Sequence, residues 1–229
     1  MINGKDTFFG EGYRKDWARL QIKGTVIDKE RVRKLMRTNN LSAPTRPGNP
    51  RGSKAHDGTI IPMKANTIWG TDATSVWTIE DGKVTVFGAV DHFVGDCIGL
   101  HAAEVGNRFE ALEPLRQAIP NYVGPYDKDV AQGILLRHDH GSQYMSDDFQ
   151  KEIKFLGMTS SPSFVREPEG NGVIERFFKT LKEQLLWIET FRNVEELLAA
   201  LHDFKERFNK QWIMQRHGYK TPDQVRAVA

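Results

Sequence analysis

Three acidic side chains stand where a metal ion could be held. Asp72 ends a short strand-like run, residues 68–72, Asp139 follows the apolar run 133–136, and Glu175 lies at the start of a helical pattern. Active sites of open α/β sheets gather at strand ends and adjoining helix termini. Mg²⁺ prefers a few carboxylates together with water and phosphate oxygens. Three such acids can therefore position two Mg²⁺ ions about 3.5–4 Å apart, an arrangement that promotes in-line displacement at a phosphodiester.

Other polar residues compete for this interpretation. An acidic residue at the end of an element, taken singly, is more typical of a cap or a turn, and Asp91 and Asp96 also stand at strand boundaries. His138 and His140 flank Asp139, and a run of this kind can bind zinc or iron. Successive strand residues point to opposite sides, so His140 is expected nearer the site than His138, as a metal neighbour rather than a ligand. Either histidine can instead bond to the backbone.

The elements that must position these residues form a mixed α/β pattern after residue 67. Short β-branched or apolar runs separated by turn residues predict strands, and apolar residues at intervals of three and four predict helices. The predicted strands are 68–72, 83–90, 94–102 and 133–136, with a hairpin turn at 80–82. The predicted helices are about 107–119, 147–155, 173–188 and 194–208. Hairpin strands followed by strands that alternate with helices predict a mixed sheet covered by helices.

The predicted helix 173–188 has two different faces. Lys179 and Lys182 follow Glu175 at i+4 and i+7 and share its face, while apolar side chains on another side can pack on the sheet. A Glu–Lys pair at this spacing, taken without context, is usually a solvent-exposed surface pair. Six aromatic residues are interpreted as core residues rather than platforms for stacked bases. They are Phe177, Phe178, Trp187, Phe191, Phe204 and Phe208.

The first 66 residues differ from the rest in charge. They carry 14 Lys or Arg and six Asp or Glu, a net charge of +8, whereas residues 67–229 have a net charge of −6. Residues 1–40 contain two short helical patterns, the second capped by Asp28, and residues 41–66 form a Pro- and Gly-rich basic linker. A basic head on an acidic body suggests a polyanion-binding segment joined to a domain that uses its carboxylates. Uneven solvated charge is an equally good interpretation of these numbers alone.

Composition excludes several classes of protein. Apolar residues make up 39% and charged residues 27%, which argues against wholesale disorder or low complexity. No stretch approaches the roughly 18–20 apolar residues of a membrane span, and the first residues lack the apolar centre of a secretory signal. Cys97 is the only cysteine, so an internal disulfide and a Cys-based zinc site are excluded and a reducing compartment is expected.

The spacing of the three acids makes a family resemblance specific. Thirty-five residues separate Asp139 from Glu175, and Asp72 lies upstream on its own strand, which resembles the D, D-35-E arrangement of the retroviral integrase superfamily. The surrounding sequence resembles the OrfB transposases of IS3-type insertion sequences over nearly the whole chain. The matching stretches are Gly70-Thr-Asp-Ala-Thr74, Leu136-Arg-His-Asp-His-Gly-Ser-Gln-Tyr144, Asn171-Gly-Val-Ile-Glu-Arg-Phe-Phe-Lys-Thr-Leu-Lys-Glu183, the head around 12–37 and the tail 208–223.

The resemblance implies a fold and a reaction. The fold would be α/β, a ribonuclease H-like mixed five-stranded sheet flanked by helices over 67–229, with a small helical, partly helix-turn-helix-like extension over 1–40. The reaction would be that of a DDE transposase, which cuts and joins DNA strands with two Mg²⁺ ions, or Mn²⁺, and without a covalent intermediate. In that arrangement Asp72 bridges the ions, while Asp139 and Glu175 each hold one.

The resemblance also implies partners. These are double-stranded DNA, both the element ends and the target, and further copies of the same chain assembled on the DNA. The expected location is the bacterial cytoplasm, in association with the nucleoid, with no membrane partner. The residues expected to contact DNA are Lys179, Lys182, Arg176 and His140 in the body and Arg33, Lys34, Arg37, Arg46 and Arg51 in the head and linker.

Two departures from the family pattern and three alternatives stay open. Many relatives read His-Ser-Asp at the second acid, where this chain has Arg-His-Asp at 137–139, and Asp-Asn before the glutamate segment, where it has Gly-Asn-Gly at 170–172. Relatives generally carry further helical residues upstream, so a truncated or domesticated DNA-binding regulator is one alternative. A stand-alone nuclease of the same fold is another. A covalent recombinase using Ser142 or Tyr144 is the weakest, because no arginine-rich framework accompanies them.

Overall fold

The computed structural model describes residues 8–43, 62–163 and 171–229, and it divides into two compact units. The head unit comprises residues 1–58 and 212–221, and the core unit comprises residues 59–211 and 222–229. The segment 212–221, which the sequence placed at the end of the body, thus groups with the basic head. None of the helices in the described ranges is both long and apolar enough to cross a membrane.

The head unit contains two short helices, α1 (Tyr13–Ile22) and α2 (Lys29–Thr38), as the sequence predicts. The Asp28 side chain caps α2 by accepting hydrogen bonds from the backbone N–H groups of Glu30 and Arg31 at 2.9 and 3.2 Å. Two short helices bury little by themselves, and the segment 212–221 adds aromatic contacts to them. The ring of Trp17 lies 6.0 Å from that of Tyr219, and the ring of Phe8 lies 4.8 Å from that of Trp212.

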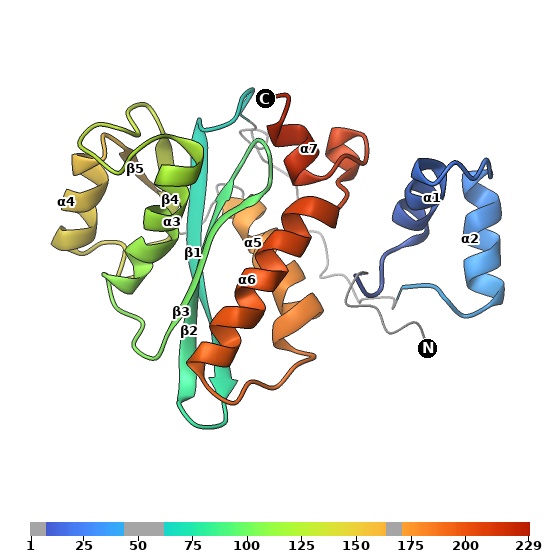
Figure 1. Cartoon of the computed structure of the whole chain (residues 1–229), viewed down its shortest axis with the longest axis horizontal. Coiled ribbons are helices and arrows are strands. Elements are labelled where there is room, and N and C mark those ends of the chain that lie inside the picture. Colours follow the sequence, from blue (N-terminus) through green and yellow to red (C-terminus); the bar gives the residue numbers. More distant parts are fainter. Residues whose placement is uncertain (1–7, 44–61, 164–170) are drawn as a thin grey trace, which may run out of the picture. The chain divides into compact units, whose positions relative to one another are not determined.

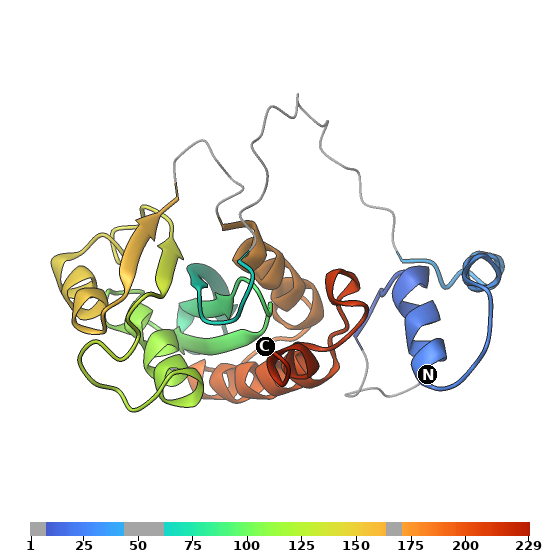
Figure 2. The ribbon, with the colours of Figure 1, turned by 90° about the horizontal axis from the view of Figure 1, so that it is seen from above.

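The core unit is built on a mixed five-stranded sheet in the order β3-β2-β1-β4-β5, which confirms the predicted fold class. The strands are β1 (Ile68–Thr78), β2 (Gly82–Asp91), β3 (Cys97–Ala103), β4 (Leu135–His138) and β5 (Thr159–Pro162). The β1–β2 and β2–β3 pairs are antiparallel, while β4 runs parallel to both β1 and β5. Figure 2 shows β4 and β5 side by side, next to the helix that joins them.

Helices cover both faces of this sheet (Figure 1). One face packs on α3 (Glu113–Tyr122) and α4 (Asp147–Phe155), and the other on α5 (Gly172–Leu181) and α6 (Val194–Gln211). Side chains of Trp69, Phe87, Leu115 and Phe149 belong to the apolar core on the α3 side. The chain ends with the short helix α7 (Pro222–Arg226). Short 3₁₀ turns occupy Glu110–Leu112 and Gln215–His217, and a π-helical turn, Lys182–Leu186, extends α5.

The structure corrects several predicted boundaries. Asp72 does not end its strand, because β1 continues to Thr78 through β-branched residues that pair with β2. Helix α3 begins at Glu113 rather than 107, since the side chain of Asn107 caps a separate 3₁₀ turn. Strand β5 lies between the predicted helices 147–155 and 173–188, where none of the predicted strands falls. Its residues, Thr-Ser-Ser-Pro, include no large apolar side chain and are not buried, as befits a short edge strand without apolar alternation.

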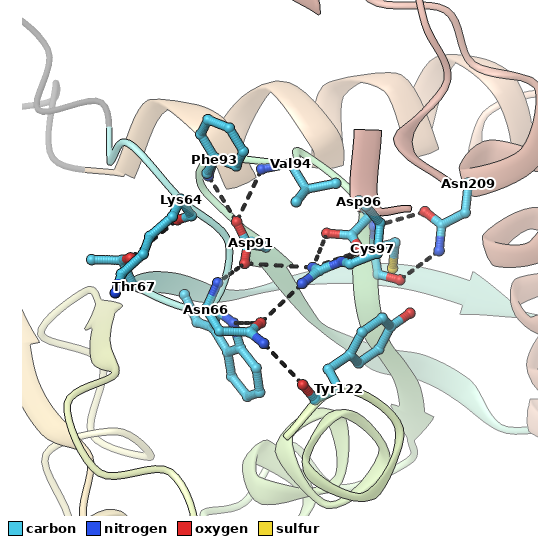
Figure 3. Close-up of polar contacts among 12 residues, drawn as sticks. Lys64, Asn66, Thr67, Asp91, Phe93, Val94, Asp96, Cys97, Tyr122 and Asn209 are labelled. Carbon is cyan, nitrogen blue, oxygen red and sulfur yellow. Dashed lines mark hydrogen bonds and ion pairs between the residues drawn. The ribbon is translucent and has the colours of Figure 1, made fainter. Parts of the chain in front are cut away.

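The two rival aspartates form a buried ion cluster with a C-terminal arginine. Arg226 pairs with Asp96 through its Nε at 3.0 Å and its Nη2 at 2.8 Å, and its Nη2 lies 3.4 Å from Asp91. Asp91 also accepts backbone N–H bonds from Asn66, Phe93 and Val94 (Figure 3). Both aspartates are buried. They therefore join the turn after β2 to α7, and this role is structural.

Candidate active site

Two of the three predicted acids line a single hollow. It has a volume of about 330 Å³ and lies between β1 and α5, so we call it the β1–α5 hollow. Predicted DNA-contacting lysines lie around it together with the two acids. Its lining residues are Asp72, Ala73, Thr74, Glu175, Phe178, Lys179, Lys182 and Trp187.

The register of β1 and β2 explains why Asp72 faces α5. Asp72 stands opposite Gly88 in the antiparallel pair, so the two residues share one face of the sheet. A Cβ atom at Gly88 would lie 3.1 Å from Cζ of Phe178, a buried residue of α5. The missing side chain at Gly88 thus lets α5 pack closely on the face from which Asp72 projects. Glu175 stands one turn before Phe178 on the same helix.

A close approach at Gly70 fixes the start of α5. Gly70 lies two residues before Asp72 and shares its face of β1. A Cβ atom there would lie 2.5 Å from His92 Nε2 and 3.0 Å from Asn171 Oδ1. Both His92 and Asn171 are buried, and Asn171 stands directly before α5. The absence of a side chain at Gly70 therefore sets how close Glu175 comes to β1.

We expect Gly70→Ala to destabilise the core unit by about 1–3 kcal/mol, because the added methyl group overpacks the contact with His92 and Asn171. Urea unfolding measures this loss. Gly172→Ala is the matched control at the start of the same helix, since nothing lies within 4 Å of a Cβ at that position. Equal stability of the Gly70 variant and the wild type would show that this contact does not constrain α5.

Asp139 directly follows β4, and the turn that begins with it is held in place by His138. The His138 ring is fully buried, with Nδ1 2.7 Å from the carbonyl oxygen of Asp139 and Nε2 2.8 Å from Oγ of Ser160. Burial lowers the pKa of this histidine. The ring also stacks on Tyr144 at 5.7 Å between centroids. His138 therefore bonds the backbone, one of the two interpretations left open by the sequence, and joins β4, β5 and the turn that carries Asp139.

Tyr144, in the same turn, is not suited to covalent catalysis. Its side chain is fully buried, and burial raises the pKa of the phenol far above its usual range. A tyrosine nucleophile must reach a phosphate and lose its proton, and a buried neutral phenol does neither. Tyr144 instead packs against Phe149 at 5.2 Å between ring centroids, as part of the core beneath the turn.

The electrostatics of Asp72 connect the three acids. Burial raises the pKa of Asp72 to about 6, and a hydrogen bond from the N–H of Ala73 at 2.8 Å opposes this rise. The negative charges of Asp139 and Glu175 raise it further, while Lys182 lowers it. Asp139 does not line the β1–α5 hollow, yet its charge acts on Asp72. The region therefore holds an excess of negative charge that a cation would relieve.

The donor set fits a hard divalent cation. Carboxylate oxygens are the ligands that Mg²⁺ prefers, and water and phosphate supply the remaining positions. Within the described ranges, no group of three His, Cys, Asp or Glu side chains stands close enough to hold a metal ion without rearrangement. One reason lies at Asp139, whose Oδ1 accepts a hydrogen bond from the N–H of Gly141 at 2.8 Å. Rotation of exposed carboxylates such as Asp139 and Glu175 would be needed to bring the three together.

We expect Asp72→Asn to stabilise the metal-free core at neutral pH. The pKa of Asp72 is raised in the folded state from 3.8 to about 6, so its contribution to stability is lost as pH rises through this interval. The asparagine side chain stays neutral at every pH in this range, so the variant keeps the stability that the wild type loses. In EDTA, the melting temperature of the variant should exceed that of the wild type at pH 7.5 but not at pH 4. A gap that is constant with pH would show that Asp72 is not strained by its ionisation.

The remaining predicted DNA contacts fall in three places. Arg176 and His140 are exposed on the core unit but do not line the β1–α5 hollow. Arg33, Lys34 and Arg37 are exposed on α2. Arg46 and Arg51 lie outside the described residues. One lining residue was missed, since Trp187 was predicted to be core and is 69% exposed instead, whereas the other five aromatic residues of that set are buried.

Comparison with known proteins finds two kinds of similarity in sequence. The profile described as "Integrase core domain" matches residues 156–222, which include Glu175, Lys179 and Lys182. Transposase InsD for insertion element IS2A/D/F/H/I/K from Escherichia coli is 27% identical over 219 residues, covering 92% of this chain and 71% of the relative. The chain resembles the transposases of insertion elements, and part of it matches an integrase core. The transposase likeness extends over most of the chain, whereas the integrase core profile covers only its later part.

Solved structures with a similar fold include retroviral integrases. A chain of the simian T-cell lymphotropic virus intasome matches with a TM-score of 0.59 and 19% identity over 91% of this chain and 69% of that one. The catalytic core of HTLV-2 integrase, solved in complex with magnesium, matches with a TM-score of 0.52 and 20% identity over 72% of this chain and 98% of that one. At this level of identity the likeness concerns the fold alone.

Proposed function

We propose that the chain is a DDE transposase that cuts DNA strands and joins their ends to a second DNA site, in a metal-dependent in-line displacement without a covalent intermediate. The observation that carries the proposal is the sharing of one hollow by Asp72, Glu175, Lys179 and Lys182 in an integrase-type core. Carboxylates for cations and lysines for phosphates are the two requirements of phosphoryl transfer. The buried, neutral Tyr144 is consistent with the absence of a covalent step.

Asp72, Asp139 and Glu175 would hold the metal ions. When bound, two Mg²⁺ ions would stabilise charge at both the attacking and the leaving oxygen of the displacement. Glu175 lies in the first turn of α5, at the positive end of the helix dipole. Asp72 must lose its proton to serve as a ligand, and its raised pKa of about 6 makes this easy only above that pH.

Lys179 and Lys182 would bind the phosphates of the strand being cut. They lie on the face of α5 that Glu175 occupies and line the same hollow. Ammonium groups that neutralise phosphates supply affinity without reading sequence. Arg176 and His140, which are exposed but do not line the hollow, would act on more distant parts of the DNA backbone.

The head unit would supply a second DNA-binding surface. The exposed residues of α2 include five basic side chains: Lys29, Arg31, Arg33, Lys34 and Arg37. A short helix that carries so many basic side chains is suited to entering a groove of DNA or to lying along the DNA backbone. Assembly of several copies on DNA, at the bacterial nucleoid, belongs to the same proposal.

Replacing Arg33, Lys34 and Arg37 together by Ala should weaken binding to duplex DNA and reduce the slope of log affinity against log salt by roughly two to three, because about 0.9 counterion is released per neutralised phosphate. Arg33 already pairs with Glu30 at 2.7 Å, which reduces its share. Fluorescence anisotropy at several salt concentrations measures both quantities. The matched control replaces Lys128, Lys151 and Lys154, which are exposed on the core unit away from the hollow. Equal slopes for both triple variants would remove α2 from the DNA-binding surface.

Strand transfer is the experiment that tests the proposal. A labelled duplex carrying the inverted repeat of the source element, incubated with the chain, Mg²⁺ and a plasmid, should yield plasmid joined to the labelled end. Cutting without joining would instead indicate a nuclease, and retention of the duplex without cutting would indicate a DNA-binding regulator. A protein–DNA adduct formed in EDTA would contradict the proposal altogether.

A further inference from the structure

A π-helical turn places an exposed tryptophan at the β1–α5 hollow. Helix α5 ends at Leu181 and continues as a π-helical turn over Lys182–Leu186, after which Trp187 follows. The backbone N–H of Trp187 donates to the carbonyl of Lys182 at 2.9 Å, five residues back. Such turns contain one residue more than an α-helical turn, and they occur often at functional sites.

The extra residue changes the direction in which Trp187 points. In an uninterrupted α-helix, a residue twelve positions after Glu175 would lie about 120° away around the axis. With one residue absorbed by the π-helical turn, Trp187 takes the place of an eleventh position, about 20° from Glu175. This is the face that Lys179 and Lys182 share. The turn keeps Leu185 and Leu186 buried while it brings the indole to the hollow.

The environment of Trp187 distinguishes it from a core residue. Its side chain is 69% exposed, whereas Phe177 and Phe178 on the same helix are 3% and 4% exposed. An exposed indole loses the apolar contacts that normally hold this side chain in place. Its neighbours around the hollow are two lysines and two carboxylates. Charged residues are depleted at the centres of protein interfaces, so a protein partner is the less suitable occupant.

We infer that Trp187 stacks on an unpaired nucleobase next to the phosphate held at the β1–α5 hollow. The inference rests on the proposed action on DNA and adds a residue that positions the strand end. A positively charged groove combined with an aromatic face is the usual arrangement for binding single-stranded DNA. Lys179 and Lys182 would bind the phosphates, and the indole would hold the base, which becomes unpaired as the strand end enters the hollow.

The test uses 2-aminopurine, whose fluorescence is quenched when it stacks. The probe is a short duplex with a single-stranded tail, in which 2-aminopurine replaces the first unpaired base. All proteins carry Asp139→Asn, so that the DNA stays intact, and Asp139 does not line the hollow. Binding of protein with Trp187 should quench the probe. Trp187→Ala should abolish the quenching and weaken binding of the tailed probe by about 5- to 100-fold, while leaving a blunt duplex within twofold. Trp187→Tyr should restore most of both effects.

Trp77→Ala is the matched control. Trp77 is 72% exposed, lies outside the lining of the hollow and stands an odd number of residues from Asp72 on β1, so it points to the opposite face. It should leave quenching and affinity unchanged. Unchanged quenching in Trp187→Ala would overturn the inference. Failure of the protein that retains Trp187 to bind the tailed probe would also overturn it. So would a change of oligomeric mass in light scattering with unchanged quenching, which would assign Trp187 to a protein interface.

Failure of this inference and failure of the proposed function are distinguishable. If the chain cuts and joins DNA but Trp187→Ala binds and quenches as wild type, the transposase proposal stands and the stacking role is wrong. If quenching depends on Trp187 but no Mg²⁺-dependent cutting occurs with intact acids, the stacking site stands and the catalytic proposal is wrong.

Discussion

Replacing any one of Asp72, Asp139 and Glu175 by its amide should slow metal-dependent cutting of DNA by roughly three orders of magnitude. The amides keep the size of the side chains but remove the charge that holds divalent cations. Loss of several kcal/mol of stabilisation of the transition state corresponds to this factor, since about 1.4 kcal/mol changes a rate tenfold. Single-turnover cutting rates, with Mg²⁺ and with Mn²⁺, measure the effect.

The controls for this series separate catalysis from folding and binding. Affinity for duplex DNA should change by only a few-fold, because the basic side chains of α2 and the hollow remain. Asp91→Asn is the matched acid outside the site, since Asp91 accepts three backbone N–H bonds and pairs with Arg226. It should lower stability, while the folded fraction keeps its cutting rate. A fully active variant among the three acids would remove that residue from the metal site.

Replacing Arg226 by Met should destabilise the core unit by about 3–5 kcal/mol, because it leaves a buried carboxylate without its counter-charge. Asp91 and Asp96 are 0% and 2% exposed, and Arg226 is 20% exposed. Burial raises the pKa of Asp96 to about 7, and the charge of Arg226 opposes this rise. Urea unfolding at pH 7.5 gives the free energy of unfolding.

Two further variants test the buried ion cluster. Asp96→Asn combined with Arg226→Met should recover part of the loss, since the amide carries no charge to leave unpaired. Arg192→Ala is the surface control, because Arg192 lies 4.0 Å from Glu80 with both side chains exposed, and it should cost less than about 1 kcal/mol. If Arg226→Met costs no more than Arg192→Ala, the cluster does not hold the C-terminal helix.

Sequence patterns located most elements because apolar periodicity decides them. The strands β1 to β4 and the helices α4 to α6 lie close to where alternation and helical spacing predict them. Strand β5 could not be found in this way, since a polar edge strand has no apolar face to generate a pattern. The end of β1 was misplaced because Asp72 resembles a strand terminator, although tertiary pairing with β2 extends the strand past it.

The chemistry of the site was predictable in part. The spacing of Asp139 and Glu175 is visible in the sequence, and so are the lysines at i+4 and i+7 from Glu175. Glu175, Lys179 and Lys182 line the hollow. Asp139 does not, but its charge raises the pKa of Asp72. The position of Trp187 was not predictable, since its exposure depends on one residue inserted by a π-helical turn. No sequence pattern marks such a turn, and helical periodicity assigns Trp187 to the core instead.

The pairing of Asp91 and Asp96 with Arg226 was equally hidden. Asp96 and Arg226 stand 130 positions apart along the chain, and contacts of this range leave no periodic signal. The two aspartates were therefore rivals for the metal site until the fold placed them at the turn after β2. A single charge-paired residue near the C-terminus decides their role.

Fe²⁺-directed cleavage of the polypeptide tests most directly whether the three acids form one metal site. Radicals generated at a bound Fe²⁺ ion by ascorbate and peroxide cut the backbone close to its ligands, and mass spectrometry locates the cuts. Cuts should cluster near Asp72, Asp139 and Glu175 together, disappear with excess Mg²⁺, and be lost in Glu175→Gln. Cuts confined to another pair of possible ligands, such as His101 and Glu110 at 2.7 Å, or at only one of the three acids, would contradict a shared metal site.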